Sequence, residues 1–158
     1  MTSTDDLAAR LIVQGSRFAR AASTAAGEQR SAVALRALSS LDQHDALRLG
    51  DLVRQERITQ PAMTATVNRL EADGLVSRAA DPTDARACLL TITNAGRLEL
   101  HAFRRRSAAA VAPALDALTD DDRAVLVRAA ELLEQLAAAA GRPHATDLDQ
   151  NPGDRTSR

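Results

Sequence analysis

A short segment with strand-like patterning lies inside a chain whose other segments have helical patterning, and this combination limits the possible folds most strongly. Met63, Val67 and Leu70 recur at the spacing of one helix face. From Leu75 to Ile92 the pattern changes to short apolar runs on both sides of a Pro/Asp/Thr cluster, which is typical of two strands joined by a turn. The sequence therefore predicts one β-hairpin within an otherwise helical fold.

Apolar periodicity and helix-capping residues predict six helices around the hairpin. Thr4, Thr59 and Thr93 are the expected N-caps of the first, fourth and fifth helices, since a Thr side chain can accept a hydrogen bond from a free N–H of the first turn. Pro113 should kink or break the fifth helix. In chain order we expect helices at about Thr4–Thr24, Glu28–Gln43, Leu47–Gln55 and from Thr59 to Gly74, strands at about Leu75–Ala79 and Ala87–Ile92, a helix after Thr93, and a last helix at about Thr119–Ala140.

Length and composition exclude several classes of protein. A chain of 158 residues suits one compact domain. Aromatic residues make up 1% of it, and Ala and Leu dominate the hydrophobic fraction of 45%, which favours helices packed closely through small side chains. No segment approaches the roughly 18 apolar residues of a membrane span, and the acidic N-terminal stretch has no secretion signal. We therefore expect a cytoplasmic protein with no membrane partner.

Charge is divided unevenly along the chain, although the net charge is −1. Residues 1–115 carry 15 Arg and 12 acidic residues, a net charge of +3, whereas residues 116–158 carry 5 Arg and 9 acidic residues, a net charge of −4. The basic excess thus lies in the same part of the chain as the hairpin. All 20 basic residues are Arg, which suits planar contacts with phosphates and bases, but we attribute this uniformity to a GC-rich coding bias.

The order of short helix, tight break, longer helix and hairpin describes a winged helix-turn-helix, in which the hairpin is the wing. The longer helix of such a fold enters the DNA major groove by its N-terminal residues. The inward stripe of Met63, Val67 and Leu70 leaves uncharged residues on the other faces, which can contact base edges and thymine methyl groups. The candidate DNA-contacting residues of this helix are Thr59, Gln60, Pro61, Ala62, Thr64, Ala65 and Asn68.

The stretch NRLEADGLVSRAADPTDARACLLTITNAGR resembles the recurring pattern of the MarR-type bacterial transcription regulators. That pattern has Arg-Leu-Glu, Gly-Leu-Val-x-Arg, Asp-Pro-x-Asp-x-Arg, a Leu-Thr-like strand end and Gly-Arg, and Ile92 stands where the family usually has Leu. The resemblance spans roughly residues 5–140. It implies a homodimer whose first and last two helices interlock, two wings, and a small-molecule pocket between the dimerisation and DNA-binding parts. The matching residues are Arg69, Leu70, Glu71, Gly74, Leu75, Val76, Arg78, Asp81, Pro82, Asp84, Arg86, Ile92, Thr93, Gly96 and Arg97.

The turn of the predicted wing has an acidic residue close to an arginine. Asp81, Pro82 and Asp84 make the turn. Asp84 lies two residues before Arg86 and can hold its guanidinium by a bidentate contact. Arg86 would then be oriented for a narrow minor groove. In the alternative interpretation, Asp81, Asp84 and Arg86 only stabilise the turn, and we favour the DNA role for Asp84 and Arg86.

Other arginines near the predicted DNA surface have alternative roles. Arg78 could contact a DNA phosphate or balance an acid of the wing, and the sequence favours neither. Arg69 lies at the far end of the fourth helix, so we expect a phosphate contact or an intramolecular ion pair there rather than base recognition. We include both among the candidate DNA-binding residues. The run 104–106 could also face DNA, but such runs are more often a solvated face or partners of an inter-subunit ion pair.

The two ends of the chain are predicted to form a dimerisation region. This region comprises residues 1–27 and 98–140, the winged helix-turn-helix comprises residues 28–97, and residues 141–158 have too few apolar side chains to pack and are expected to be disordered. One winged-helix core has room for only part of the broad apolar face of the last helix. The alternative is a monomer whose end helices pack on their own domain. The candidate dimerisation residues are Leu7, Leu11, Phe18, Val125, Ala129, Leu132 and Leu136.

No catalytic or metal-binding constellation is evident in the sequence. His44, His101 and His144 lack the i, i+4 spacing of metal ligands on a helix, and a nucleophile-base set is not recognisable. Some MarR-type relatives sense oxidants with a Cys near the N-terminus and Tyr partners, but this chain has no Tyr. Cys88 is therefore interpreted as a small strand residue. We expect a protein that is not an enzyme and uses no cofactor or metal.

The combined interpretation is a mainly α fold with a small β-hairpin wing, made of a winged helix-turn-helix and a helical dimerisation region. We expect a transcriptional repressor that binds double-stranded DNA as a homodimer on a pseudo-palindromic operator, with a small-molecule effector as a further partner. Two alternatives stay open. The first is a winged-helix protein-interaction module, because fold alone does not determine function. The second is a DNA-binding regulator without a ligand, whose Ala-rich helices fill the space between the two regions.

Overall fold

The computed structural model describes residues 3–140, apart from the side chains of residues 85 and 86. The predicted tail at 141–158 and the side chain of Arg86 therefore lie outside the described residues. Two compact units are present, residues 1–113 and residues 114–158. No described helix is long and apolar enough to cross a membrane. The helices and strands are α1 (Thr4–Ala25), α2 (Ala32–Asp42), β1 (Leu47–Arg48), α3 (Leu49–Glu56), α4 (Gln60–Ala72), β2 (Val76–Asp81), β3 (Asp84–Ile92), α5 (Asn94–Asp116) and α6 (Asp120–Ala140).

The six helices expected from the sequence are present in the described part, and α1 and α2 need a correction at their N-terminal caps. The N-cap of α1 is Ser3 rather than Thr4. α2 begins at Ala32 rather than Glu28, because Ser31 caps it. In both helices the Ser Oγ accepts a hydrogen bond from the backbone N–H three residues later, at 3.2 and 3.1 Å. Serine is a strong N-cap residue, so each helix begins directly after one.

The sheet has a third strand that the sequence analysis did not predict. β1 consists of Leu47 and Arg48, which lie opposite Leu90 and Leu89 of β3 in an antiparallel pair. The strand order of the sheet is β1-β3-β2. α3 consequently begins at Leu49 and not at the predicted residue, Leu47. A strand of two residues is too short to show an alternating pattern, so the sequence pattern assigns its residues to the following helix.

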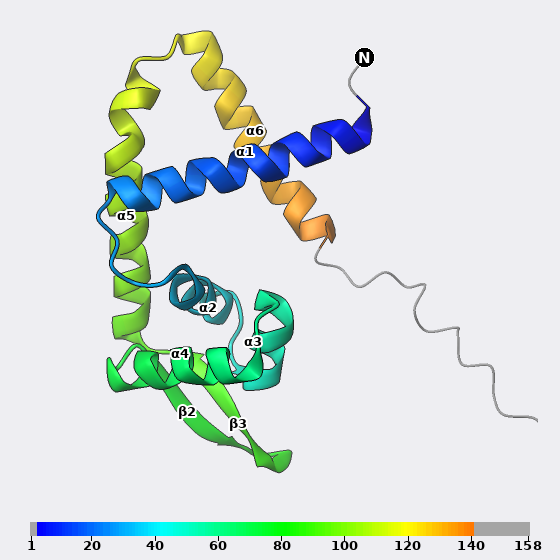
Figure 1. Cartoon of the computed structure of the whole chain (residues 1–158), viewed down its shortest axis with the longest axis vertical. Helices are drawn as coiled ribbons and strands as arrows, with labels where there is room; N and C mark the ends of the chain where they lie inside the picture. Colours follow the sequence, from blue (N-terminus) through cyan, green and yellow to red (C-terminus); the bar gives the residue numbers. More distant parts are fainter. Residues whose placement is uncertain (1–2, 141–158) are drawn as a thin grey trace, which may run out of the picture. The chain divides into compact units, whose positions relative to one another are not determined.

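β2 and β3 form the predicted hairpin, and both strands are longer than predicted. Their antiparallel pairing runs from Val76 opposite Ile92 to Asp81 opposite Asp84, with a shift of register just before the turn. The added length lies near the turn, where small and polar residues carry little strand signal. The hairpin extends beyond α4 on the side away from α2 (Figure 1). The predicted wing is therefore present, with its turn where the sequence placed it.

A glycine ends α4 and turns the chain into the wing, as predicted. Gly74 has φ +71°, a left-handed conformation that glycine adopts without steric cost. The N–H of Gly74 donates to the carbonyl of Glu71 at 2.9 Å, and the N–H of Leu75 donates to the carbonyl of Leu70 at 2.8 Å. These are the two hydrogen bonds of a Schellman motif. They satisfy carbonyl groups at the end of α4 while the chain reverses toward β2.

The start of α5 is packed against the end of α4. Thr93 caps α5 as predicted, since its Oγ1 accepts from the N–H of Gly96 at 3.0 Å and donates to the carbonyl of Gly74 at 2.7 Å. The N–H of Thr93 donates to the carbonyl of Leu75 at 3.0 Å. Gly96 is buried at this contact, where a Cβ would lie 2.7 Å from Cγ1 of Ile92 and even closer to the carbonyl oxygen of Leu75. Only a glycine therefore fits without a shift of the backbone.

One apolar core holds α2, α3, α4, α5 and the sheet together. Met63, Val67 and Leu70 of α4 are buried in it, as their helical spacing predicted. Burial of apolar surface is the main stabilising contribution to folding, so α4 is held by its inner face and its outer face stays exposed. The fully buried partners of this stripe include Leu38 and Leu41 of α2, Leu52 of α3, Leu90 of β3 and Leu100 of α5.

The proline in α5 does not break that helix. α5 is continuous from Asn94 to Asp116 and contains Pro113. A proline removes one backbone hydrogen bond, but the helix continues on both sides of Pro113. α6 begins after Thr119, whose Oγ1 accepts from the N–H of Asp122 at 3.1 Å. The predicted start of the last helix is confirmed, with three acidic residues in the first turn, where the helix dipole favours negative charge.

Gly96→Ala should destabilise the fold, because the added methyl group would press against the backbone of Leu75. Overpacking of a close contact costs about 1–3 kcal/mol, and we expect the free energy of unfolding to fall by about this amount in urea denaturation. Gly15→Ala in α1 is the control. A Cβ at Gly15 has no other atom within 4 Å, so the helix propensity of Ala should raise stability by up to about 1 kcal/mol. Equal effects of the two substitutions would contradict the close packing at Gly96.

Candidate nucleic-acid interface

The outer face of α4 carries uncharged side chains that line a shallow groove. The groove belongs to the helix whose inner stripe is buried in the core, so its lining residues are held on a fixed backbone. No charged residue lines it within the described part. A surface of this kind can approach the edges of base pairs closely. The lining residues, all of them predicted to contact DNA, are Gln60, Pro61, Thr64, Ala65 and Asn68.

The first turns of α4 present a small and partly apolar surface to solvent. Thr59 is the N-cap, as predicted, but its side chain makes no capping hydrogen bond. Pro61 follows in the first turn, where its missing N–H does no harm. The Oγ1 of Thr64 donates to the carbonyl of Gln60 at 2.8 Å, so Thr64 offers solvent its methyl group and an acceptor lone pair. With Ala62 exposed beside them, these residues suit contact with thymine methyl groups.

Arg78 of β2 is directed back onto α4. Its Nη2 donates to Oδ1 of Asn68, and its Nε lies 3.1 Å from Oε2 of Glu71. The sequence analysis allowed either a phosphate contact or an ion pair with an acid of the wing. An ion pair is present, but its acid belongs to α4 rather than to the wing. Arg78 therefore joins the first strand of the wing to the outer face of the helix.

Arg69 lies toward the other end of α4 and lines a small cavity together with Arg30. Arg30 is paired with Asp73 at 2.7 Å and with Glu99 at 3.7 Å. These contacts, with the hydrogen bond to Asp73 as the largest cause, raise the pKa of Arg30 above its ordinary value. Arg69 has no ion pair with any residue that the structure describes. The intramolecular pair considered for Arg69 is thus not found there, and its phosphate contact stays a prediction.

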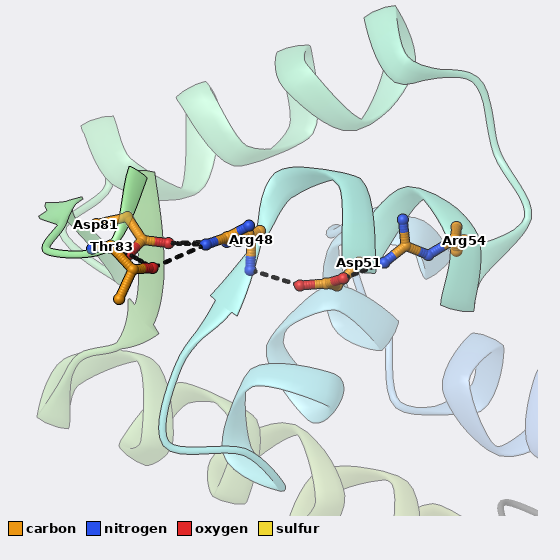
Figure 2. A network of polar contacts seen from close by, with 5 residues as sticks. All are labelled: Arg48, Asp51, Arg54, Asp81 and Thr83. Atoms are coloured by element: carbon orange, nitrogen blue, oxygen red, sulfur yellow. Dashed lines mark hydrogen bonds and ion pairs between the residues drawn. The ribbon is translucent and has the colours of Figure 1, made fainter. Parts of the chain in front are cut away.

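A buried carboxylate ties the turn of the wing to the start of α3 (Figure 2). The side chain of Asp81 is only 4% exposed. Its Oδ2 accepts a hydrogen bond from Nε of Arg48 at 2.8 Å and lies 2.5 Å from Nη2 of the same guanidinium. Its Oδ1 accepts from the N–H and the hydroxyl of Thr83, at 2.8 and 2.7 Å. Both carboxylate oxygens are thus occupied, which fixes the turn in one conformation.

The same arginine also organises the first turn of α3. The backbone N–H of Arg48 donates to Oδ2 of Asp51 at 3.0 Å, and Asp51 also pairs with Arg54. Figure 2 shows this continuous chain of contacts from the wing turn through Arg48 to α3. Arg48 therefore positions the wing relative to the helix-turn-helix. This role could not be predicted from the sequence, because Arg48 and Asp81 are 33 residues apart and arginine is not a usual residue at a helix N-cap.

The predicted contact between Asp84 and Arg86 lies outside the described residues, because the side chain of Arg86 is not described. Asp84 is exposed at the start of β3, opposite Asp81. The DNA roles of Asp84 and Arg86 stay predictions. Asp81 does stabilise the turn, which is the alternative that the sequence analysis considered, but its partner is Arg48.

The arginine run on α5 has partners within the same chain. Nη1 of Arg104 lies 3.4 Å from Oδ2 of Asp42, and Nη2 of Arg106 lies 2.9 Å from Oε2 of Glu28. Burial raises the pKa of Glu28, but hydrogen bonds from the backbone of Arg30 and from the Arg106 side chain outweigh it, so the pKa lies below its ordinary value. These pairs tie α5 to α2 and to the loop before α2, which is a structural role.

A cavity of about 520 Å³ lies among α1, α2 and α5 in the first unit. Its lining combines apolar side chains, including Leu35 and Phe103, with the three arginines Arg20, Arg36 and Arg104. Ligand sites are typically apolar clefts with a few polar groups that orient the ligand, and guanidinium groups bind carboxylates well. The cavity is therefore suited to a small molecule with an apolar body and an acidic group.

Cys88 lies half-buried in β3 and packs against the core. This is the position of a small strand residue, as the sequence interpretation has it. Within the described residues, no three side chains of His, Cys, Asp or Glu gather in an arrangement that could hold a metal ion.

Asp81→Asn should make the stability of the protein less dependent on pH. Hydrogen bonds from the side chain and the backbone of Thr83, and then the contact with Arg48, hold the pKa of Asp81 below its ordinary value of 3.8. A lowered pKa stabilises the fold above the pKa of the unfolded chain, and this contribution is lost as the pH falls through the folded-state pKa. Wild type should therefore be more stable than the variant at pH 7, and the difference should shrink below pH 3.8.

Urea unfolding of both proteins between neutral and acidic pH measures this difference. Asp45→Asn, in the exposed loop before β1, is the control and should follow the wild type throughout. A difference between wild type and Asp81→Asn that persists unchanged in acid would contradict the ionic anchoring of the wing.

Comparison with known sequences finds relatives over most of the chain. The MarR family matches residues 31–88, which begin at the cap of α2 and end within β3. An uncharacterized HTH-type transcriptional regulator of Mycobacterium leprae is 32% identical over 102 residues, which cover 65% of this chain and 71% of that protein. The HTH-type transcriptional repressor MdtR of Bacillus subtilis is 28% identical over 114 residues, which cover 72% of this chain and 69% of that protein.

Comparison with solved structures finds the same fold. A mutant of MarR from E. coli has a TM-score of 0.67 at 21% identity, covering 82% of this chain and 95% of that chain. FabT of Streptococcus pneumoniae, solved in complex with DNA, has a TM-score of 0.52 at 20% identity, covering 72% of this chain and 79% of that chain. The family match over the winged helix and the identity to the mycobacterial regulator show that this chain belongs to the MarR family of transcriptional regulators.

Proposed function

We propose that this protein is a repressor that binds a pseudo-palindromic DNA operator as a homodimer and responds to a small-molecule effector. The proposal rests on two surfaces that lie side by side, the groove of α4 and the wing. The uncharged groove of α4 lies next to a wing whose turn is fixed to α3 through Arg48 and Asp81. A helix and a wing that are already held in one orientation lose little freedom when they engage DNA, which favours binding.

The DNA contacts follow from the two surfaces. α4 would enter the major groove by its N-terminal end, with Gln60 and Thr64 at the base edges. Arg86 on the wing would reach an adjacent narrow minor groove. FabT has the same fold and was solved in complex with DNA, which supports this mode of binding. The similarity to the repressor MdtR supports repression, because a protein on an operator excludes other proteins from that DNA.

Exposed apolar side chains on α1 and α6 support a homodimer. α1 buries only Ala22, and α6 buries none of its residues. Extended exposed apolar surface marks a protein interface, and a symmetric dimer would cover the same surface on both copies. The exposed side chains, between 38% and 66%, include Leu7, Leu11 and Phe18 of α1 and Val125, Leu132 and Leu136 of α6.

The cavity among α1, α2 and α5 supports the effector. It leaves room for a small molecule, which supports a ligand-responsive regulator over the alternative in which Ala-rich helices fill this space. Arg36 and Arg104 are paired with Glu56 and Asp42, whereas Arg20 has no ion pair with a described residue and favours a ligand with an acidic group. A ligand there would contact helices of both predicted regions, α2 and α5, and could change DNA affinity by binding two conformations of the protein unequally.

Selection of bound duplexes from random DNA tests the proposed function. We expect an inverted repeat whose half-sites are centred about 10 base pairs apart, with an affinity that falls as the salt concentration rises. A winged-helix module for protein interaction would instead enrich no sequence. That result would refute the DNA-binding function while leaving the fold and the family assignment intact.

Arg86→Ala should weaken operator binding severely and leave the dimer intact. A specific base contact is worth about 1–3 kcal/mol, which corresponds to a rise of the Kd by about 5- to 150-fold. Arg128→Ala removes the same charge from an exposed position on α6 and should change the Kd much less. Fluorescence anisotropy titration of the selected operator measures both. An unchanged Kd for the Arg86 variant would refute the assignment of the wing.

Leu132→Asp combined with Leu136→Asp should dissociate the dimer and abolish operator binding, because one half-site alone gives too little affinity. Val127→Asp with Ala130→Asp places the same charges on the opposite side of α6 and should leave the dimer intact. Sedimentation equilibrium at micromolar concentration gives the mass of each protein. A monomeric wild type would overturn the dimer, and a Leu132/Leu136 variant that remains dimeric would place the interface elsewhere.

A further inference from the structure

Asn68 is the residue of the α4 groove whose polar atoms are constrained by another element. It is exposed and lines the groove with Gln60 and Thr64. Its Oδ1 accepts a hydrogen bond from Nη2 of Arg78, which lies on β2. The wing therefore acts directly on a side chain in the middle of the surface that we propose to contact bases.

The chemistry of arginine determines which end of the Asn68 amide faces it. A guanidinium carries five N–H donors and no acceptor. Only the amide oxygen of Asn68 can therefore face Arg78, and the amide nitrogen with its two hydrogens is directed elsewhere. The orientation of the amide follows from the presence of Arg78 and not from the backbone of α4 alone.

Arg78 is itself held in place for this role. Its Nε lies 3.1 Å from Oε2 of Glu71, and the Arg78 side chain is only 32% exposed. Asn68 and Glu71 are three residues apart and thus lie on one face of α4, so one guanidinium spans both. Its charge is largely balanced by Glu71. Arg78 is consequently less suited to a DNA phosphate than an unpaired arginine would be.

A free asparagine recognises adenine through two hydrogen bonds, since its oxygen accepts from N6 and its nitrogen donates to N7. The Arg78 contact disfavours this arrangement, because one of the two lone pairs of Oδ1 already accepts from Nη2, and turning both amide atoms toward one base would weaken that hydrogen bond. The amide nitrogen can still donate. Its partners in the major groove are then acceptors, namely O6 and N7 of guanine, O4 of thymine and N7 of adenine. At adenine, however, the neighbouring N6 amino group is left without an acceptor, which makes adenine the least favourable of the three.

Building on the proposed DNA-binding function, we propose that Arg78 is a positioning residue that engages the amide oxygen of Asn68 and leaves the amide nitrogen, a hydrogen-bond donor, to contact the base. Asn68 thereby prefers guanine or thymine to adenine at one base pair of each half-site. Arg78 controls sequence specificity through Asn68 without contacting the base.

Selection from random duplex DNA with wild type and with Arg78→Met tests the proposal. Methionine keeps an unbranched side chain of similar length but donates no hydrogen bond. At one base pair of each half-site, the preference of wild type for guanine or thymine over adenine should fall by about tenfold in the variant, with adenine gaining. Arg97→Met is the matched control, because Arg97 is paired with Asp42 at 2.9 Å and lies on α5. It should leave the base profile unchanged.

Asn68→Asp provides a second test that does not depend on the folding of the Arg78 variant. Aspartate keeps the contact with Arg78 but has no donor for the base. It should lose the same preference at the same base pair, and circular dichroism and thermal unfolding show that the variant is folded. An Asn68→Asp variant with the wild-type base profile would overturn the proposal.

The Arg78→Met result separates the two roles of this arginine. If affinity falls equally for all sequences and the base profile is unchanged, Arg78 is a phosphate contact and the proposal is wrong. If neither affinity nor profile changes, the proposal is also wrong. If wild type itself enriches no sequence, the proposed DNA-binding function fails first and this inference fails with it.

Discussion

The contact between Gly96 and the backbone of Leu75 is the constraint on which the DNA-binding region depends. At this point the end of α4, the start of β2, the end of β3 and the start of α5 meet, joined by hydrogen bonds of Thr93 to Gly74 and Leu75. A side chain at Gly96 would separate α5 from the end of α4. Because all four elements leave this junction in fixed directions, the helix and the wing form one body.

Two further connections fix the wing on that body, one near its base and one at its turn. Arg78 joins β2 to α4 through Asn68 and Glu71, whereas Arg48 joins the turn to α3 through Asp81. The Arg78–Glu71 pair is partly exposed, and exposed ion pairs contribute about 0–1 kcal/mol to stability, so the value of Arg78 lies in orientation. A hairpin that is held at both ends can present its turn in one place without help from DNA.

The sequence predicted the parts of this arrangement that depend on neighbours along the chain. The buried stripe of α4, the glycine that ends it and the Thr93 cap all follow local rules of spacing and capping, and the turn of the wing follows from Pro and Asp. The parts it missed depend on residues that are distant in sequence. β1 is too short for a pattern, and Arg48 meets Asp81 only after the sheet has formed. The ion pair of Arg78 with Glu71 could not be predicted either, because Arg78 lies on β2 and Glu71 lies on α4.

Ion pairs within the chain reduce the number of arginines in residues 1–115 that are available to DNA phosphates. Many arginines in this part are paired with acids of the same chain, including Arg30, Arg36, Arg48 and Arg97. Each of these pairs removes a cation that could neutralise a phosphate. Since salt-dependent affinity for DNA grows with the number of phosphates neutralised, the 15 arginines of residues 1–115 overstate the number of cations that are available to DNA. Recognition must then rest more on the uncharged face of α4, where the orientation of one amide can decide which base is accepted.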